Sequence, residues 1–239
     1  MGFRETFFDI GNYLSRRVST TLARPVTMPL IYQTRVADAF IYENGNMISM
    51  AFAYCANNKI KGDYAEFGVF KGRTTTEAWK ASKRHALSDM RFWLFDSFEG
   101  LPEVAGADTG GPFETGEFSA GRSEFERNLK GVGVDFTRVE IVPGYFDKTL
   151  PGRATDRKFS VVWIDCDLYE STVPVLDWLT GKLVDGAVVC FDDWFTFSGK
   201  PDKGEQKATA EWLEKNPDIS LMPYRDFHWG GKSFLVHQK

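Results

Sequence analysis

The feature that most constrains the fold is an alternation of short apolar runs and amphipathic segments that begins near residue 63. Runs of strand length cover residues 64–69, 91–95, 138–142, 159–164 and 187–191, and two later ones cover 219–222 and 233–236. Helical patterns cover residues 34–57, 74–86, 123–130, 171–179 and 207–215. Strands separated by helices form a parallel sheet through right-handed crossovers. The pattern predicts an α/β fold with a Rossmann-like, mostly parallel sheet and helices on both faces.

Composition excludes several classes of protein. The 239 residues carry a formal net charge of −4, which argues against a nucleic-acid partner because such proteins need a basic stripe. The longest apolar candidate, residues 47–56, is too short for a membrane span. The start MGFRET lacks the order of a signal peptide, and we interpret its match to the myristoylation pattern as chance. Three cysteines without metal spacing indicate buried thiols, and we expect a cytoplasmic protein.

Polar residues or glycines follow several of the predicted strands. Gly68, Asp96, Asp165 and Asp192 each stand where a strand ends. In open α/β sheets, ligands bind beyond the carboxyl ends of the strands, so these residues are expected on one edge. The Gly-rich, acidic stretch 97–121 is longer than an ordinary connection, which favours a lid or binding loop.

The segment from Glu66 to Thr74 follows a strand and opens a helix. Gly68 allows a tight turn, and Gly72 allows the helix to begin close to a ligand. The two glycines are four residues apart, so this is not the dinucleotide fingerprint G-x-G-x-x-G. The acid Glu66 would attract an ammonium group rather than a pyrophosphate. A strand–turn–helix junction without a ligand is the alternative.

Asp96 ends the next strand, where a carboxylate is placed to accept hydrogen bonds from ribose hydroxyls. Its alternative role is to cap the following turn. Together with Glu66 it favours a nucleoside cofactor that carries an amine and lacks a pyrophosphate. S-adenosylmethionine meets both requirements.

Three carboxylates, Asp165, Asp192 and Asp193, follow two strands in succession. Converging acids repel one another unless a cation lies between them, and oxygen ligands select Mg²⁺, with Ca²⁺ or Mn²⁺ as alternatives. A solvated acidic edge is the other interpretation. We expect Asp167 to cap the helix that begins near Tyr169, with a supporting role at the metal as the alternative.

Several motifs resemble one family in their order and spacing. They are EFGVFKGRT, LFDSFEGLPE, VPGYFDKTLPG, WIDCDLYEST and the Asp192-Asp193 pair, within residues 34–210. The chain resembles the macrocin-type (TylF-like) O-methyltransferases, which are class I S-adenosylmethionine-dependent enzymes. The resemblance implies a seven-stranded sheet with the last strand antiparallel. It also implies an N-terminal helical lid or oligomerisation segment over residues 1–60 and a single methyltransferase domain over 61–239.

The resemblance also implies site residues. Metal ligands would be Asp165, Asp192 and Asp193, with Asp165 also a catalytic group. His228 is a candidate catalytic group for a different reason, because it is the histidine that stands before the last strand, near the expected ligand edge. Cofactor contacts would come from Glu66, Gly68, Val69, Phe70, Gly72, Thr74, Asp96, Ser97, Gly144, Tyr145, Phe146 and Asp165. Core packing is the alternative for Tyr145 and Phe146. A structural turn is the alternative for His228, and Asp147 is another candidate base.

The expected acceptor is a small molecule with a hydroxyl or diol. The resemblance implies a sugar hydroxyl of a glycosylated natural product or glycan, and a catechol or other phenol is the alternative. Six aromatic side chains are candidates to stack on it: Phe113, Phe118, Trp194, Phe195, Phe197 and Trp229. Family members are often oligomers, so a homo-oligomer is expected, with Glu43 as a candidate substrate contact. Two rival functions are a cofactor-binding protein without chemistry and a nucleotide-dependent oxidoreductase.

Overall fold

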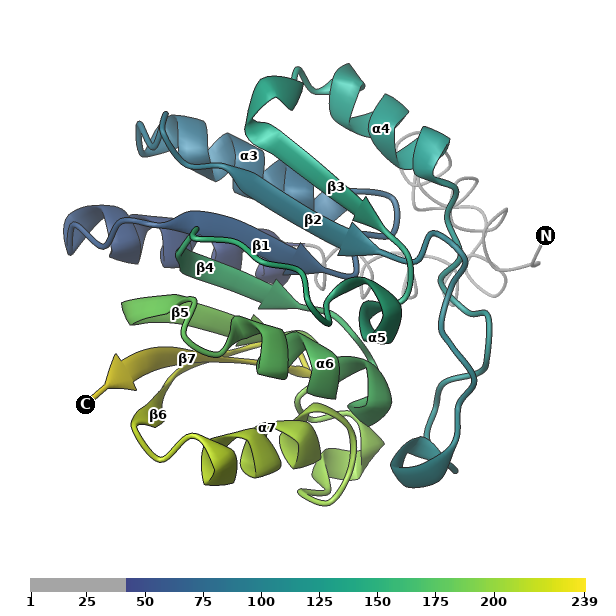
Figure 1. Ribbon diagram of the computed structural model, residues 1–239. Coiled ribbons are helices and arrows are strands. Elements are labelled where there is room, and N and C mark those ends of the chain that lie inside the picture. The colour runs from purple at the N-terminus through teal and green to yellow at the C-terminus, as the bar shows by residue number, and fades with distance from the viewer. Residues whose placement is uncertain (1–41) are drawn as a thin grey trace, which may run out of the picture. The chain divides into compact units, whose positions relative to one another are not determined.

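The computed structural model describes residues 42–239, and the expectations for residues 1–41 lie outside this part (Figure 1). Residues 42–57 form a helix, and a compact unit extends from Met47 to Lys239. No helix within the described residues has both the length and the apolar character that a bilayer crossing requires.

The unit is built on a seven-stranded sheet in the order β3-β2-β1-β4-β5-β7-β6. The strands are β1 Asp63–Phe67, β2 Phe92–Asp96, β3 Val139–Pro143, β4 Phe159–Ile164, β5 Leu183–Phe191, β6 Ile219–Phe227 and β7 Gly231–Gln238. The first five are parallel, and β7 runs antiparallel to both β5 and β6. The predicted sheet with its antiparallel last strand is therefore confirmed. β6 extends five residues beyond the predicted 219–222, because its outer half is exposed and lacks an apolar pattern.

Helices cover both faces of the sheet (Figure 1). They are α3 Arg73–Arg84, α4 Arg122–Gly131, α5 Phe146–Thr149, α6 Tyr169–Leu179 and α7 Gly204–Lys215. One apolar cluster joins residues 47–55, α3 and α4 to one face, and a second joins α6 and α7 to the other. The one-turn helix α5 was not predicted, since four residues show no periodicity.

Strand β1 shows how this layering buries a charged residue. All five of its residues are buried, with Tyr64 in one apolar cluster and Ala65 and Phe67 in the other. Alternate residues of a strand face opposite sides, so Glu66 faces the same side as Tyr64. Packing on both faces therefore encloses the Glu66 carboxyl.

The loop over residues 97–121 passes the carboxyl ends of the strands (Figure 1). Its two arms are joined by backbone hydrogen bonds from Leu101 N–H to the Glu117 carbonyl (2.9 Å) and from Gly116 N–H to the Leu101 carbonyl (3.0 Å). The Asp108 carboxylate fixes its far end by accepting the Tyr169 N–H at the start of α6, at 2.9 Å. The middle of the loop is thus held against the start of α6.

Candidate functional site

The candidate site lies where the strand order reverses, between β1 and β4. This is the position at which open α/β sheets bind ligands. Gly68 follows β1 with φ +87°, and a Cβ atom there would lie 1.9 Å from the Asp165 carbonyl oxygen after β4. Only glycine fits this approach. The predicted cofactor turn and the predicted acidic cluster are therefore in direct backbone contact.

Asp96 links the turn after β1 to the turn after β2. Its Oδ2 accepts the amide N–H groups of Val69 (2.7 Å) and Phe70 (3.0 Å), and its Oδ1 accepts that of Phe98 (2.6 Å). A carboxylate has about four acceptor positions, so about one remains for a further donor. The structure thus places Asp96 beside the glycine turn and shows that it also organises this turn.

Glu66 is enclosed beneath the same turn. Its Oε2 accepts the Tyr64 hydroxyl (2.9 Å) and the Thr75 hydroxyl (2.7 Å), whereas Oε1 is buried without a hydrogen-bond partner among the described residues. Burial, with a smaller contribution from the charge of Asp96, raises the pKa of Glu66 to about 8. A buried acceptor without a donor is uncommon and fits a carboxyl that receives a donor from a ligand.

The threonine that contacts Glu66 is Thr75, whereas its neighbour Thr74 stays a predicted contact to the cofactor. Thr74 lies one residue earlier in α3, whereas the Thr75 side chain is fully buried. The helical spacing of apolar residues Ala78 and Trp79 was the signal that Thr75 faces the sheet.

Gly72 has a packing reason for being glycine. It precedes α3 with φ +83°, and a Cβ atom there would lie 2.9 Å from the Phe125 ring of α4. No side chain caps the first turn of α3. Gly72 has no side chain, so it supplies no acceptor for the free N–H groups in the first turn of the helix.

Of the predicted cofactor contacts after β2 and β3, Gly144 lies beside the site, whereas Phe146 packs into the core. Gly144 N–H donates to the Asp96 carbonyl at 2.8 Å, which places this turn beside the site. The Phe146 ring packs edge-on against Phe67, with centroids 5.9 Å apart, so it joins the apolar core. Ser97 Oγ donates to the Gly100 carbonyl (2.9 Å) and accepts the Glu99 N–H (3.0 Å). Tyr145 is half-buried at the start of α5.

Three carboxylates converge after β4 and β5. One oxygen from each of Asp165, Asp167 and Asp193 lies within 4.8 Å of the other two, within the described part of the chain. Asp167 has φ +61°, and this bend brings its side chain toward the other two acids. Asp192 Oδ1 lies 3.4 Å from Nε2 of His228, and after burial the charge of Asp192 is the largest cause that raises the pKa values of Asp165 and Asp193. Asp165 and Asp193 of the predicted metal set therefore lie in this group together with Asp167, and Asp192 stays a predicted ligand.

The prediction that Asp167 caps α6 was wrong. The N–H groups of Tyr169 and Glu170 donate instead to Asp108, at 2.9 and 3.4 Å. Asp108 lies sixty-one residues before Tyr169 in the chain, so no local pattern indicated it. Because Asp108 caps the helix, the Asp167 carboxylate does not, and it lies in the acidic group instead.

Glu205 extends the concentration of negative charge. This buried residue in the first turn of α7 accepts the Asp193 N–H at 3.0 Å through Oε2, and its Oε1 has no hydrogen-bond partner among the described residues. Burial first, and neighbouring carboxylates second, raise the pKa values of Asp165, Asp167 and Glu205 well above their usual range. The same causes raise the pKa of Asp193 to about 7. Clustered oxygen donors of this kind fit a hard divalent cation.

His228 has a defined orientation. Its Nδ1 accepts the N–H groups of Gly230 (2.9 Å) and Gly231 (3.2 Å), so the neutral ring carries its proton on Nε2, the nitrogen that faces Asp192. The side chain is only 2% exposed. In this arrangement the neutral ring has no lone pair free to accept a proton from a substrate.

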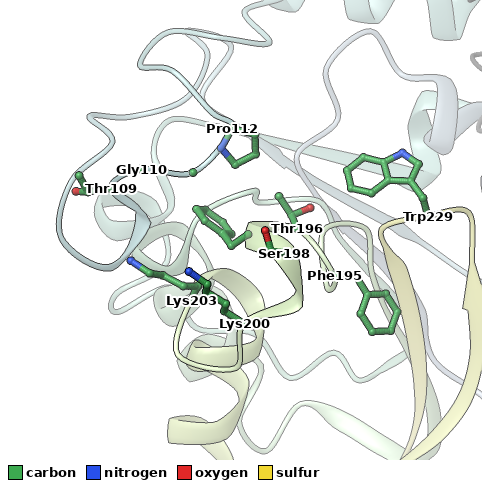
Figure 2. A pocket seen from close by; sticks show the side chains of 11 residues that line it. Thr109, Gly110, Pro112, Phe195, Thr196, Ser198, Lys200, Lys203 and Trp229 are labelled. Carbon is green, nitrogen blue, oxygen red and sulfur yellow. The ribbon is translucent and has the colours of Figure 1, made fainter.

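A pocket of about 600 Å³ opens between the long loop and the segment after β5 (Figure 2). Residues 109–112 of the long loop, residues of the 195–203 segment and Trp229 line it. Thr196 connects it to the acids, since its Oγ1 donates to Asp193 Oδ1 at 3.0 Å. Of the six predicted aromatic contacts, Phe195, Phe197 and Trp229 line this pocket, whereas Trp194 packs on Phe234 with centroids 4.7 Å apart.

The other two predicted aromatic side chains, Phe113 and Phe118, belong to a series of ring contacts. Phe70 meets Phe118, Phe118 meets Phe113, and Phe113 meets Phe197, with centroids 5.8 to 6.4 Å apart. These rings connect the turn after β1, through the long loop, to the segment after β5. Asp147 is exposed and pairs with Lys148 at 2.7 Å, so it is separate from the acidic group.

Comparisons with known proteins agree with this geometry. The chain is 34% identical over 142 residues to an 8-demethyl-8-(2,3-dimethoxy-alpha-L-rhamnosyl)-tetracenomycin-C 4'-O-methyltransferase of Streptomyces olivaceus, over 56% of this chain and 54% of that protein. It is 30% identical over 143 residues to a demethyldecarbamoylnovobiocin O-methyltransferase of Streptomyces niveus, over 57% and 54%. The chain thus spans about half the length of the curated relatives it matches.

Solved structures show the same fold. The O-methyltransferase NovP superposes with a TM-score of 0.69 at 24% identity, over 82% of this chain and 80% of that one. A calicheamicin methyltransferase superposes with a TM-score of 0.68 at 21% identity, over 98% and 93%. The family model described as Macrocin-O-methyltransferase (TylF) matches residues 43–210. The resemblance predicted from the motifs is confirmed, and the chain belongs to the macrocin-O-methyltransferase (TylF) family.

Proposed function

We propose that this protein is an S-adenosylmethionine-dependent O-methyltransferase that methylates a sugar hydroxyl of a glycosylated natural product. The observation that carries the proposal is the contact between Gly68 and Asp165, since it joins a nucleoside-type turn to an acidic group at one edge of the sheet. The two curated relatives are named as O-methyltransferases, and the name of the first includes a rhamnosyl group.

The turn after β1 supplies the proposed cofactor contacts. Glu66 Oε1 is the unsatisfied acceptor for the methionyl ammonium group, and Asp96 has about one acceptor position left for a ribose hydroxyl. Tyr145 stays the predicted contact to adenine. Gly68, Val69, Phe70 and Gly72 would approach the cofactor through their backbone.

The acidic group supplies the proposed metal site. Asp165 and Asp193 would hold Mg²⁺ through carboxylate oxygens, with Asp192 as the third predicted ligand. When bound, such an ion would supply Lewis-acid activation of the acceptor hydroxyl. Thr196 donates to the carboxylate of Asp193, and Glu205 accepts its backbone N–H, so together they fix the orientation of Asp193. This fixed orientation matters because methyl transfer depends mainly on alignment of the acceptor oxygen.

Asp167 is the proposed proton acceptor. It lies in the same group as the proposed ligands, and its αL backbone turns its carboxylate toward them. Burial and the neighbouring acids raise its pKa, which makes its ionised form a stronger base than a solvated carboxylate. We assign His228 a positioning role, because its Nε2–H faces Asp192 and its Nδ1 is engaged by backbone amides.

The long loop and its ring contacts would exclude water from the reaction. Phe113 and Phe118 connect Phe70 on one side of the site to Phe197 on the other. A lid or oligomerisation role for residues 1–60, a homo-oligomer and a substrate contact from Glu43 stay predictions.

A methyl-transfer assay tests the proposal. Purified protein is incubated with methyl-labelled S-adenosylmethionine, Mg²⁺ and a panel of rhamnosides, other glycosides and catechols, with and without EDTA. Transfer to a glycoside that EDTA abolishes supports the full proposal. Transfer to catechols alone supports the phenol alternative, and cofactor binding without transfer to any acceptor supports a non-catalytic binding protein.

A further inference from the structure

Two buried hydroxyl groups hold one oxygen of the Glu66 carboxyl. Thr75 Oγ1 donates to Oε2 at 2.7 Å, and the Tyr64 hydroxyl donates to the same oxygen at 2.9 Å. All three residues are at most 1% exposed. Oε1 of the same carboxyl is buried and has no hydrogen-bond partner among the described residues. Both protein donors therefore occupy one oxygen, and the other oxygen can accept from a ligand.

The Thr75 hydroxyl does not serve its own helix. A threonine in a helix can donate to the carbonyl four residues earlier, and Thr76 does so, with its Oγ1 2.8 Å from the Gly72 carbonyl oxygen. Thr75 lies one position earlier on α3, and its hydroxyl reaches Glu66 on strand β1 instead. This hydrogen bond links the helix that follows the glycine turn to the strand that precedes it.

The Tyr64 ring is held in place by its neighbours. It packs against Phe52 and Phe92, with ring centroids 5.6 and 5.3 Å apart. Tyr64 and Glu66 are two residues apart in β1, so their side chains face the same side of the sheet. A buried tyrosine hydroxyl needs an acceptor, and Glu66 Oε2 supplies it. The carboxyl is thus restrained from the strand by Tyr64 and from the helix by Thr75.

These two hydrogen bonds favour the charged form of Glu66. Burial raises the pKa of this carboxyl, and the hydrogen bonds from Thr75 and Tyr64 are the next largest effects and lower it. An ammonium group forms a stronger hydrogen bond to a carboxylate than to a neutral acid. The two hydroxyls therefore fix the direction of Oε1 and also support the charge that an ammonium group would meet there.

We infer that Thr75 and Tyr64 are positioning residues for the cofactor, because their hydroxyls hold Glu66 with Oε1 directed at the methionyl ammonium group. This inference rests on the proposed function, which assigns that contact to Glu66. A carboxylate that already has its binding orientation loses less conformational entropy when the ligand arrives. The alternative is that the two hydroxyls satisfy a buried acid and contribute to stability alone.

Two ligands that differ in the methionyl moiety separate these alternatives. S-adenosylhomocysteine carries the ammonium group, whereas 5'-methylthioadenosine keeps the adenosine and the thioether and lacks the amino-acid part. Isothermal titration measures both affinities for the wild type, for Thr75→Val, which removes the hydroxyl and keeps the branched shape, and for Thr75→Ser, which keeps the hydroxyl. Tyr64→Phe removes the second donor in the same way.

The matched control is Thr209→Val in α7. Thr209 is a buried helical threonine whose hydroxyl has no hydrogen-bond partner in the described part of the chain. We expect Thr75→Val and Tyr64→Phe to bind S-adenosylhomocysteine about tenfold more weakly than the wild type, since hydrogen bonds to charged groups are among the stronger ones. Their affinity for 5'-methylthioadenosine should be unchanged. Thr75→Ser and Thr209→Val should bind both ligands as the wild type does.

Three results would overturn the inference. One is a Thr75→Val variant that binds S-adenosylhomocysteine as tightly as the wild type does, and another is an equal loss of affinity for both ligands, which indicates a purely structural role. The third is a wild type that binds 5'-methylthioadenosine as tightly as S-adenosylhomocysteine, because Oε1 then receives no ammonium group. This third result leaves the proposed function standing, whereas a wild type that binds neither ligand contradicts both. Melting temperatures verify that each variant is folded.

Discussion

Oδ1 of Asp108 lies 2.9 Å from the backbone nitrogen of Tyr169, so a residue of the long loop caps a helix that begins sixty-one residues later. Its other oxygen lies 3.4 Å from the Glu170 nitrogen, and Asp108 itself is buried. The loop that covers the candidate site is therefore part of the stable domain.

Asp108→Ala is expected to lower the free energy of unfolding by about 1–2 kcal/mol, because it removes the side-chain acceptor from the part-buried N–H groups of Tyr169 and Glu170. Urea denaturation measures this change, with Asp202→Ala as an exposed control. Equal stability of the two variants would show that the cap contributes nothing.

Glu66 gives a pH dependence with a definite sign. Its pKa is about 8 in the folded protein and near 4.5 in the unfolded chain, so the folded state binds the proton more tightly. The stability that this group contributes is complete below pH 4.5 and is lost as the pH rises to about 8, by up to about 1.4 kcal/mol per pH unit. Urea denaturation of wild type and Glu66→Gln across this range should show a steeper decline for the wild type. Parallel curves would contradict this account.

Removal of the metal ligands should abolish stabilisation by a divalent ion. Mg²⁺ is expected to raise the melting temperature of the wild type, because a ligand that binds only the folded state at 100 times its Kd adds about 2.7 kcal/mol. Asp165→Asn/Asp193→Asn should show no such rise, and Asp202→Asn should behave like the wild type. Differential scanning calorimetry with and without EDTA checks this, and an equal response of the double variant would exclude this metal site.

Asp167 and His228 can be separated by kinetics. Asp167→Asn is expected to lower kcat by about 10²- to 10⁴-fold, the usual contribution of a general base, with unchanged affinity for S-adenosylhomocysteine. His228→Gln should lower kcat less, since the ring faces Asp192 and its Nδ1 is engaged by Gly230. A larger loss in His228→Gln, together with loss of the acidic limb of the pH–rate profile, would reverse the two assignments.

The sequence was enough to predict which edge of the sheet carries the candidate site. It was not enough to predict the directions of individual side chains at that edge. Asp96 and Asp165 were found because a polar residue directly after a buried strand is a local signal. The position of Asp167 in the acidic group depends on its own backbone, where φ is +61°, and no residue type requires that angle. Tertiary contacts explain the other differences: Asp108 and Glu205 reach the site from distant segments, as their hydrogen bonds to α6 and to Asp193 show.

The binding of the cofactor tests the central claim most directly. Isothermal titration of the metal-free protein with S-adenosylhomocysteine should show saturable binding to the wild type. Asp96→Ala should weaken it by at least about tenfold, since the substitution removes the proposed ribose acceptor together with the bonds to Val69 and Phe70. Asp147→Ala, an exposed acid on α5, should bind as the wild type does. Circular dichroism verifies that each variant is folded. The absence of any binding heat in a folded wild-type protein would contradict the assignment of this chain as an S-adenosylmethionine-dependent methyltransferase.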